Sequence, residues 1–175
     1  MTVGRKVEVV RTYLELNSSA AFRPARLVDA AVTLERVPRC TVELSRRLYH
    51  EVGEAYHWVD RLAWTDTELD AYLTQAGFGV WLMRYDRKVA GFFELRTDAD
   101  KSIEIALFGL LTEFVGRGLG KHLLSCAVDE AWVMGASRVW LHTCTLDSPV
   151  ALPNYVARGF VPYRKEAYEA EFSSA

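Results

Sequence analysis

The hydrophobic and polar positions of this chain follow two different periods, one typical of strands and one typical of helices. The first stretch of the chain favours strands. Residues 7–16 are rich in β-branched and aromatic residues. Residues 30–37 form a second run of this kind, after a turn segment that contains Pro24. The pattern therefore predicts an N-terminal hairpin over about residues 1–37.

Two helices and three strands are expected next. Residues 41–56 carry apolar side chains at mostly helical spacing, and the capping box Thr65-Asp-Thr-Glu68 opens a second helix that ends before Gly77. Tight turns at Asp86-Arg87 and at residues 98–101 then separate three apolar runs. These runs predict the antiparallel centre of a sheet, with strands at residues 79–85, 89–96 and 103–111.

The remainder of the chain alternates between helix and strand. One apolar helical face ends at Gly135 and consists of Leu119, Leu123, Leu124, Ala127, Val128, Ala131 and Met134. Residues 138–145 and 160–172 are predicted to be extended, and Ser148-Pro149 resembles an N-cap followed by the first residue of a helix. Pro153 would kink that helix. The order of elements predicts one α/β domain over residues 1–175 with a mixed sheet.

A glycine-rich turn carries the clearest chemical signal, because it joins an apolar strand to a helix. Gly116, Gly118 and Gly120 allow positive φ and close approach of the backbone, so several N–H groups can converge on an anion at the positive end of the helix. A nucleotide-triphosphate loop is excluded, because Lys121 is followed by His122 where a magnesium-binding hydroxyl would be needed. The spacing of the glycines also disfavours a dinucleotide fingerprint. A phosphate or pyrophosphate ligand is expected, although a purely structural strand–turn–helix stays open.

This stretch resembles motif A of the GCN5-related N-acetyltransferases (the GNAT family), Arg/Gln-x-x-Gly-x-Gly/Ala, which falls here on Val115 to Gly120. Gly109-Leu-Leu-Thr-Glu-Phe precedes it in the place of the family's V-x-P-E-Y, and Tyr155-Val-Ala-Arg-Gly-Phe160 is similar to its Y-x-x-x-G-F signature. The likeness covers roughly residues 78–170 and departs from the family at Val115, where Arg or Gln is usual.

The resemblance implies a fold and a co-substrate. The fold would be a mostly antiparallel sheet flanked by helices, with a cleft between the splayed strands on either side of the glycine loop and its helix. Acetyl-CoA would lie in that cleft, held by an acyl-CoA-binding core at about residues 78–172. Arg117 or Lys121 would supply the charge that Val115 lacks. The expected contact residues are Phe108, Leu110, Val115, Gly116, Arg117, Gly118, Leu119, Gly120, Lys121, Ser148 and Asn154, without a metal.

The resemblance also implies direct acetyl transfer to a primary amine within a ternary complex. Glu104 interrupts an apolar strand at the spacing of the catalytic glutamate in the histone-acetylating branch, and a cleft lined by Ile103, Ile105 and Leu107 would raise its pKa. An outward-facing Glu104 on an alternating strand is the alternative, with His142 as a substitute base. Tyr155 occupies the family's position for the acid that protonates the departing thiolate, or else only packs against the cofactor.

The acceptor is harder to predict from sequence. Trp58, Trp64 and Asp60 lie between the two early helices and would form an aromatic cup with one carboxylate, suited to a cationic amine. Alternatively, the tryptophans seal the helices onto the sheet. Nothing distinguishes a peptide N-terminus, a lysine, an aminoglycoside, a polyamine or a small amino acid, and the resemblance leaves a homodimer open.

Composition narrows the class of protein further. The chain has 175 residues, half of them hydrophobic, and its net charge of −2 with dispersed basic residues argues against a nucleic-acid partner. Cys40, Cys126 and Cys144 form no paired motif and are expected to be reduced thiols. Without a long apolar run or a charged leader, no membrane partner and a cytoplasmic location are expected. Two function classes remain: an acetyl-CoA-dependent N-acyltransferase, and a non-catalytic acyl-CoA-binding or interaction module.

Overall fold

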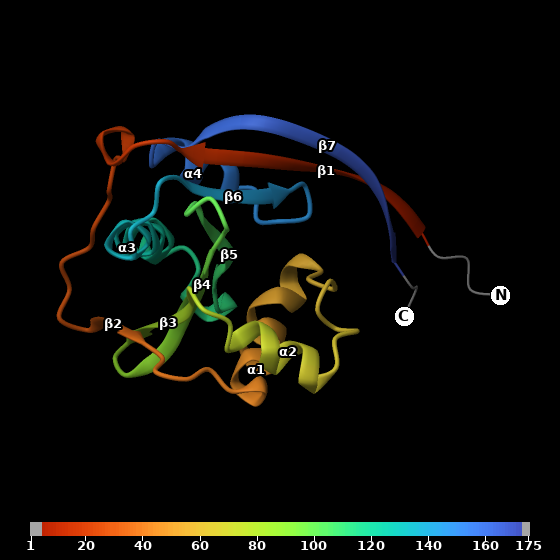
Figure 1. The fold of residues 1–175 in the computed structure, drawn as a ribbon, viewed down its shortest axis with the longest axis horizontal. Helices are drawn as coiled ribbons and strands as arrows, with labels where there is room; N and C mark the ends of the chain where they lie inside the picture. The colour runs from red at the N-terminus through yellow and green to blue at the C-terminus, as the bar shows by residue number, and fades with distance from the viewer. Residues whose placement is uncertain (1–4, 173–175) are drawn as a thin grey trace.

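The computed structural model describes residues 5–172, which form a seven-stranded sheet with helices on both faces (Figure 1). The strands are β1 (Arg5–Leu16), β2 (Val32–Arg36), β3 (Phe78–Tyr85), β4 (Lys88–Thr97), β5 (Ile103–Leu110), β6 (Val139–Cys144) and β7 (Val161–Phe172). The helices are α1 (Val42–Gly53), α2 (Asp66–Leu73), α3 (Leu119–Val133) and α4 (Ala151–Ala157). Short 3₁₀ turns are η1 (Ser19–Ala21), η2 (Glu54–Tyr56) and η3 (Thr112–Phe114).

The order of the strands is β2-β3-β4-β5-β6-β1-β7, and the sheet opens in its middle. Every neighbouring pair is antiparallel except β5 and β6, which are parallel. These two strands pair only where Ile103 and Glu104 lie opposite Val139 and Trp140. Beyond that point they diverge. The predicted α/β class, the mostly antiparallel mixed sheet and the splay around the glycine loop are therefore confirmed.

The predicted N-terminal hairpin over residues 1–37 is wrong in the part of the chain that the structure describes. Strand β1 lies between β6 and β7, with Arg11 opposite Cys144 on one side and Glu166 on the other. Strand β2 instead pairs with β3 at the far edge of the sheet. The pattern of β1 specified a strand that buries Leu14 and Leu16, but a strand's partners are set by packing with distant parts of the chain.

The two faces of the sheet have different coverings. Helix α3 packs its predicted apolar face on one side, where Phe93 and Leu95 of β4 are fully buried. Helices α1 and α2 cover the other side of β3–β5, where Phe92 is buried with Leu48 of α1. Because side chains alternate along a strand, the β4 residues that share a face with Phe92 point toward α1 and α2. The charged side chains described below lie on that second face.

Helix caps and a tight turn, which depend on neighbouring residues, set several boundaries of the helices and strands. Thr41 caps α1, and Thr65 forms the predicted capping box with Glu68 at the start of α2. Asp86 and Arg87 both have positive φ, as a tight two-residue hairpin turn requires.

Helix α4 departs from the prediction at its start. Val150 is its N-cap, whereas the expected cap Ser148 accepts a hydrogen bond from Ala151 N through its backbone carbonyl. Pro153 therefore lies in the first turn of a short helix, where backbone N–H groups have no partner within the helix. The predicted interior proline and its kink are wrong for this reason.

Candidate active site

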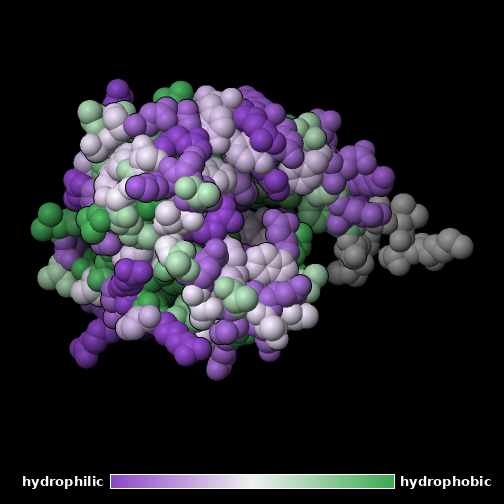
Figure 2. Space-filling model, in the orientation of Figure 1, coloured by the Kyte–Doolittle hydropathy of each residue, from purple (hydrophilic) through white to green (hydrophobic). Residues whose placement is uncertain are grey.

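A cavity of about 620 Å³ lies in the opening of the sheet. Strands β5 and β6 form its floor, the connection between α1 and α2 forms one wall, and α4 and the end of β7 form the others. Figure 2 shows the surface hollowed between the β1–β7 ribbon and the region of α1 and α2. The His57 and Phe172 ring centroids are 4.8 Å apart, so the end of β7 meets the α1–α2 connection across this cavity.

The glycine loop stands at one end of the cavity. Gly116 and Gly118 have φ of +83° and +76°, and Gly118 is the N-cap of α3 without any side-chain cap. A Cβ at Gly116 would meet no atom within 4 Å, and a Cβ at Gly118 would find only Lys121 Cε at 3.6 Å. The space around these two glycines is thus open at the positive end of α3, which fits the pyrophosphate of an acyl-CoA. Gly120 lies within α3 and does not adopt the positive φ that a glycine allows.

The other expected acyl-CoA contacts divide into two groups. The cavity lining includes Phe108, Leu110, Val115, Gly120, Ser148 and Asn154. It does not include Gly116, Arg117, Gly118, Leu119 or Lys121. Leu119 is fully buried in the core, and the Arg117 guanidinium carbon lies 5.4 Å from the ring centroid of Phe114. The Lys121 side chain, in contrast, lies beside the loop at Gly118, so the expected replacement of the missing charge by Arg117 or Lys121 stays a prediction.

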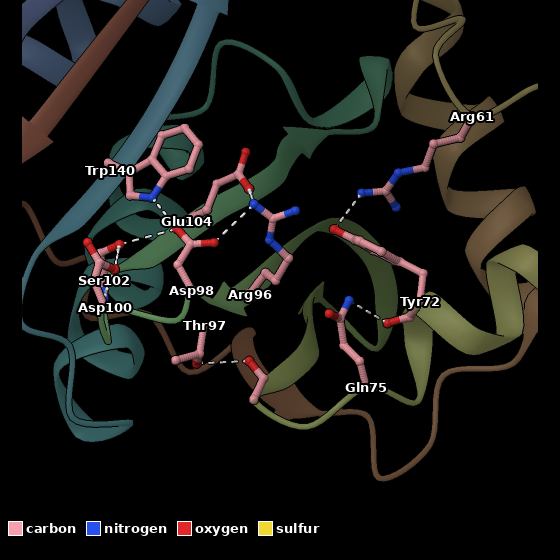
Figure 3. Close-up of polar contacts among 11 residues, drawn as sticks. Arg61, Tyr72, Gln75, Arg96, Thr97, Asp98, Asp100, Ser102, Glu104 and Trp140 are labelled. Atoms are coloured by element: carbon pink, nitrogen blue, oxygen red, sulfur yellow. Dashed lines mark hydrogen bonds and ion pairs between the residues drawn. The ribbon is translucent and has the colours of Figure 1, made fainter.

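Glu104 lies in the cavity lining and is only 7% exposed. Its Oε2 is 2.7 Å from Arg96 Nη2, on the adjacent strand β4 (Figure 3). Burial raises the pKa of Glu104, and the Arg96 charge opposes that rise. The expected environment needs one correction: Ile105 and Leu107 line the cavity, whereas Ile103 is fully buried in the core beneath α3. Alternation along β5 places Ile103 and Glu104 on opposite faces.

A polar network, which the sequence did not indicate, holds Arg96 in place. Asp98 Oδ1 lies 3.1 Å from Arg96 Nη2, and Asp98 Oδ2 accepts hydrogen bonds from Trp140 Nε1 at 2.8 Å and Ser102 Oγ at 3.2 Å. These side chains surround the short paired stretch of β5 and β6 (Figure 3). The network orients the carboxylate of Glu104 through Arg96.

Tyr155 reaches the same cavity from α4 and is 6% exposed. Its ring is edge-on to Phe108 and Phe160, at centroid distances of 6.1 and 6.2 Å. Burial raises the pKa of the phenol far above its ordinary value, so Tyr155 keeps its proton at neutral pH. The fold therefore brings Glu104 and Tyr155 into one cavity from separate elements.

The predicted acceptor residues Trp58, Asp60 and Trp64 all line the cavity. Both tryptophans also pack on the core, since Trp58 lies edge-on to Phe92 and Trp64 edge-on to Tyr72. The two interpretations of these tryptophans, as a cup and as a seal, are compatible. Asp60 is exposed at the wall.

The α1–α2 connection is tied to the sheet by a second charged pair that the sequence did not reveal. Arg61 Nη2 is 2.8 Å from Glu94 Oε2, and Arg61 Nη1 donates to Glu94 Oε1 at 3.1 Å. Arg61 also donates to the Tyr72 hydroxyl at 3.1 Å and lies over the Tyr72 ring (Figure 3). This pair fixes the wall that carries Trp58 and Asp60.

The remaining candidate residues are the histidines and cysteines. His142 lines the cavity, and burial lowers its pKa, so its imidazole is neutral at pH 7. Cys40, Cys126 and Cys144 are free cysteines; Cys40 is buried and Cys144 lines the cavity. His122 accepts a hydrogen bond from Leu27 N through Nδ1 at 3.0 Å.

Residues 5–172 show neither a metal-binding cluster nor a membrane-spanning helix. Within that range, no cluster of three or more His, Cys, Asp or Glu side chains is arranged to hold a metal ion. None of the helices in the same range is both long and apolar enough to cross a membrane.

Comparison with solved structures places the fold among acetyltransferases. A GCN5-related N-acetyltransferase from Kribbella flavida is 23% identical, with a TM-score of 0.66 over 97% of this chain and 61% of its own. A second, from Sphaerobacter thermophilus, is 16% identical, with a TM-score of 0.66 over 98% of this chain and 54% of its own. A tandem GNAT protein from the clavulanic acid biosynthesis pathway is 14% identical, with a TM-score of 0.62 over 98% of this chain and 56% of its own.

This chain thus spans less than two thirds of the length of each of these three proteins, and identities this low establish the fold alone. No curated protein matches the sequence. A sequence model described as the acetyltransferase (GNAT) family does match, over residues 44–160. That range contains the glycine loop, Glu104 and Tyr155, which the fold gathers around one cavity. The chain is therefore a member of the GNAT acetyltransferase family.

Proposed function

We propose that this protein transfers the acetyl group of acetyl-CoA to a primary amine by direct transfer in a ternary complex. The observation that carries the proposal is the shared cavity, which Glu104 and Tyr155 both line and at whose end the glycine loop stands. Acetyl-CoA would supply an activated thioester. The N–H groups at the start of α3 would hold its pyrophosphate, and Phe108, Leu110, Ser148 and Asn154 would contact the rest.

Glu104 is the proposed general base. A primary amine is mostly an ammonium ion at neutral pH and must lose a proton before its nitrogen can attack the thioester carbon. Burial raises the pKa of Glu104 toward the range useful for accepting that proton, while Arg96 keeps the carboxylate charged and oriented. As the new C–N bond forms, the C–S bond breaks and the sulfur becomes a thiolate.

Tyr155 is the proposed general acid. Its phenol is protonated at neutral pH, since an ordinary tyrosine is and burial raises the pKa of Tyr155 further, so a proton is present for the departing thiolate. Trp58, Asp60 and Trp64 would form the acceptor side of the cavity. A cytoplasmic location stays a prediction.

A non-catalytic acyl-CoA-binding module is the second candidate. Val115 favours it, because this residue occupies the first motif position and is 43% exposed beside the loop without a charged group. Such a module would bind acetyl-CoA and leave the thioester intact.

The test combines binding with turnover. Acetyl-CoA should stabilise the folded protein by about 2.7 kcal/mol at a hundredfold excess over Kd, and Gly118→Glu should abolish that shift because its carboxylate enters the anion site. Gly135→Glu is the matched control, since Gly135 has a similarly positive φ but follows the C-terminal end of α3, away from the glycine loop. An amine panel with thiol detection then separates the candidates. Thiol release supports the transferase, binding without release supports the module, and an unchanged shift in Gly118→Glu contradicts the loop assignment.

A further inference from the structure

The charged side chains of the cavity are unevenly paired. Three arginines line it. Arg61 is paired with Glu94, and Arg96 with Glu104 and Asp98. The third, Arg11, has no carboxylate within 4.0 Å among residues 5–172. One guanidinium of the cavity thus has no carboxylate in ion-pair contact within the described residues; its polar neighbours are the phenols of Tyr13 and Tyr168, which raise its pKa.

The neighbours of Arg11 explain why it lacks a partner. Glu166 lies opposite Arg11 on β7, but its Oε2 accepts hydrogen bonds from the Tyr13 hydroxyl at 3.1 Å and from Arg164 Nη2 at 2.8 Å. The guanidinium of Arg11 instead lies 5.0 Å from the ring centroid of Tyr168, and its Nε is buried without a hydrogen bond. A buried donor without an acceptor carries a desolvation penalty, which a ligand oxygen would remove.

A carboxylate of opposite sign stands on another wall. Asp60, on the α1–α2 connection, lines the cavity and makes no ion pair within the described part of the chain. Burial is the largest cause of the lowered pKa of His142; among the charges, Arg11 lowers that pKa, and Asp147 and Asp60 raise it. Asp147 also lines the cavity, but its Oδ2 already accepts hydrogen bonds from Thr143 Oγ1 and Cys144 N. Arg11, Asp60, His142 and Glu104 all line this one cavity.

We propose that the acceptor is a small amino carboxylate: its amine lies toward Asp60 and Glu104, and its carboxylate binds Arg11. This inference rests on the proposed function and names its substrate class. A guanidinium presents paired donors that match a carboxylate in bidentate geometry, which an ammonium side chain cannot do. Polyamines carry no hydrogen-bond acceptor for Arg11, and aminoglycosides offer it only neutral hydroxyl and ether oxygens, so neither class would neutralise its charge.

The test uses pairs of amines that differ only in the carboxylate: phenylalanine against phenethylamine, and lysine against cadaverine. Dissociation constants are measured on the full chain saturated with CoA, and kcat/KM with acetyl-CoA by thiol release. The wild-type protein should prefer the carboxylate-bearing member of at least one pair by roughly 10- to 100-fold, the range expected for a charge-assisted hydrogen bond.

Arg11→Gln should remove that preference while the carboxylate-free amine and acetyl-CoA bind as before, and Arg11→Lys should restore it in part. Arg5→Gln is the control, because Arg5 lies on the same strand outside the cavity lining. The inference is overturned if the wild type shows no preference in binding or turnover, if Arg11→Gln keeps it, or if Arg11→Gln weakens acetyl-CoA binding instead. An Arg11-dependent binding preference without thiol release would support an amino-carboxylate binding site at Arg11 and overturn the proposed function.

Discussion

Two glutamate–arginine pairs lie on the same face of the sheet, and they differ in what they can do. Glu94 of β4 pairs with Arg61, and Glu104 of β5 pairs with Arg96. Burial raises the pKa of both glutamates, and a neighbouring arginine opposes the rise in each case. By the direction of the pKa alone, either carboxyl would qualify as a general base.

Access separates the two pairs. The side chains of Glu94 and Arg61 are 2% and 11% exposed, and the rings of Trp64 and Tyr72 lie against the guanidinium. Glu104 lines the cavity, and its partner Arg96 is 32% exposed. Arg61 lines the cavity but Glu94 does not, so this pair ties the α1–α2 connection to the sheet, whereas the Glu104 carboxylate can itself meet a substrate. A perturbed pKa marks a functional residue only when the group is also reachable.

Glu94→Gln is expected to have the largest effect of the variants that test this difference between the two pairs. The variant leaves the buried Arg61 charge without a partner, so unfolding free energy should fall by about 3–5 kcal/mol. Urea denaturation measures the loss. The control Glu35→Gln breaks the exposed Glu35–Arg84 pair and should lose less than about 1 kcal/mol. Equal losses in the two variants would contradict the structural role of Glu94.

Glu104→Gln tests the other pair through rate rather than stability. Loss of the base should slow acetylation on the order of 10²-fold below about pH 8, or about 2.7 kcal/mol of barrier, with acetyl-CoA binding retained. The defect should shrink as pH rises, because more of the amine arrives deprotonated. Steady-state pH profiles give the measurement, with the exposed Glu51→Gln on α1 as control. An unchanged profile would move the base elsewhere, with His142 next to be tested.

Tyr155→Phe removes the proposed general acid, which lines the same cavity from α4. The variant keeps the edge-on packing with Phe108 and removes only the proton donor, so kcat should fall by up to about 10²-fold with little change in acetyl-CoA affinity. Because burial raises its pKa, Tyr155 should add no alkaline limb near neutral pH. Tyr163→Phe, on exposed β7, serves as the control. Wild-type kcat in Tyr155→Phe would leave this residue as a wall of the cavity.

Arg96→Met is expected to have the smallest effect, a shift in pH dependence. Arg96 opposes the rise in the pKa of Glu104, so its removal should raise that pKa further. Glu104 must be deprotonated to act, so the acid limb of kcat/KM should move to higher pH.

Stability provides a second readout of Arg96→Met. A carboxyl whose folded pKa exceeds its unfolded value contributes stability at low pH that is lost as pH rises through the folded pKa. The stability gap between wild type and variant should therefore widen as pH rises. Arg96→Lys keeps the charge and should shift the limb less; an identical shift in both variants would show that geometry, not charge, tunes Glu104.

Local patterns predicted the elements well. The capping box at Thr65, the tight turn at Asp86-Arg87 and the apolar face of α3 were each correctly predicted, because each depends on residues close in sequence. The start of α4 was predicted wrongly: the N-cap is Val150 rather than Ser148. A proline suits several positions in the first turn of a helix, so it does not fix which residue is the cap.

Contacts between distant segments escaped prediction. The placement of β1 between β6 and β7 joins residues from opposite ends of the chain, and with it Arg11 enters the cavity. The Arg61–Glu94 and Arg96–Glu104 pairs likewise cross between elements. A sequence shows that each charged residue exists, but hydrophobic periodicity says nothing about which charge it meets.

The glycine loop, the helix that follows it and the residue types that acetyl transfer requires can all be predicted from the sequence. They depend on backbone freedom and short-range periodicity. Only the tertiary structure decided that Glu104 and Tyr155 line one cavity, that Glu94 is sealed away from it, and that Arg11 lies in its wall without a carboxylate partner. These outcomes depend on strand order and on the divergence of β5 from β6, which arise from packing across the whole sheet.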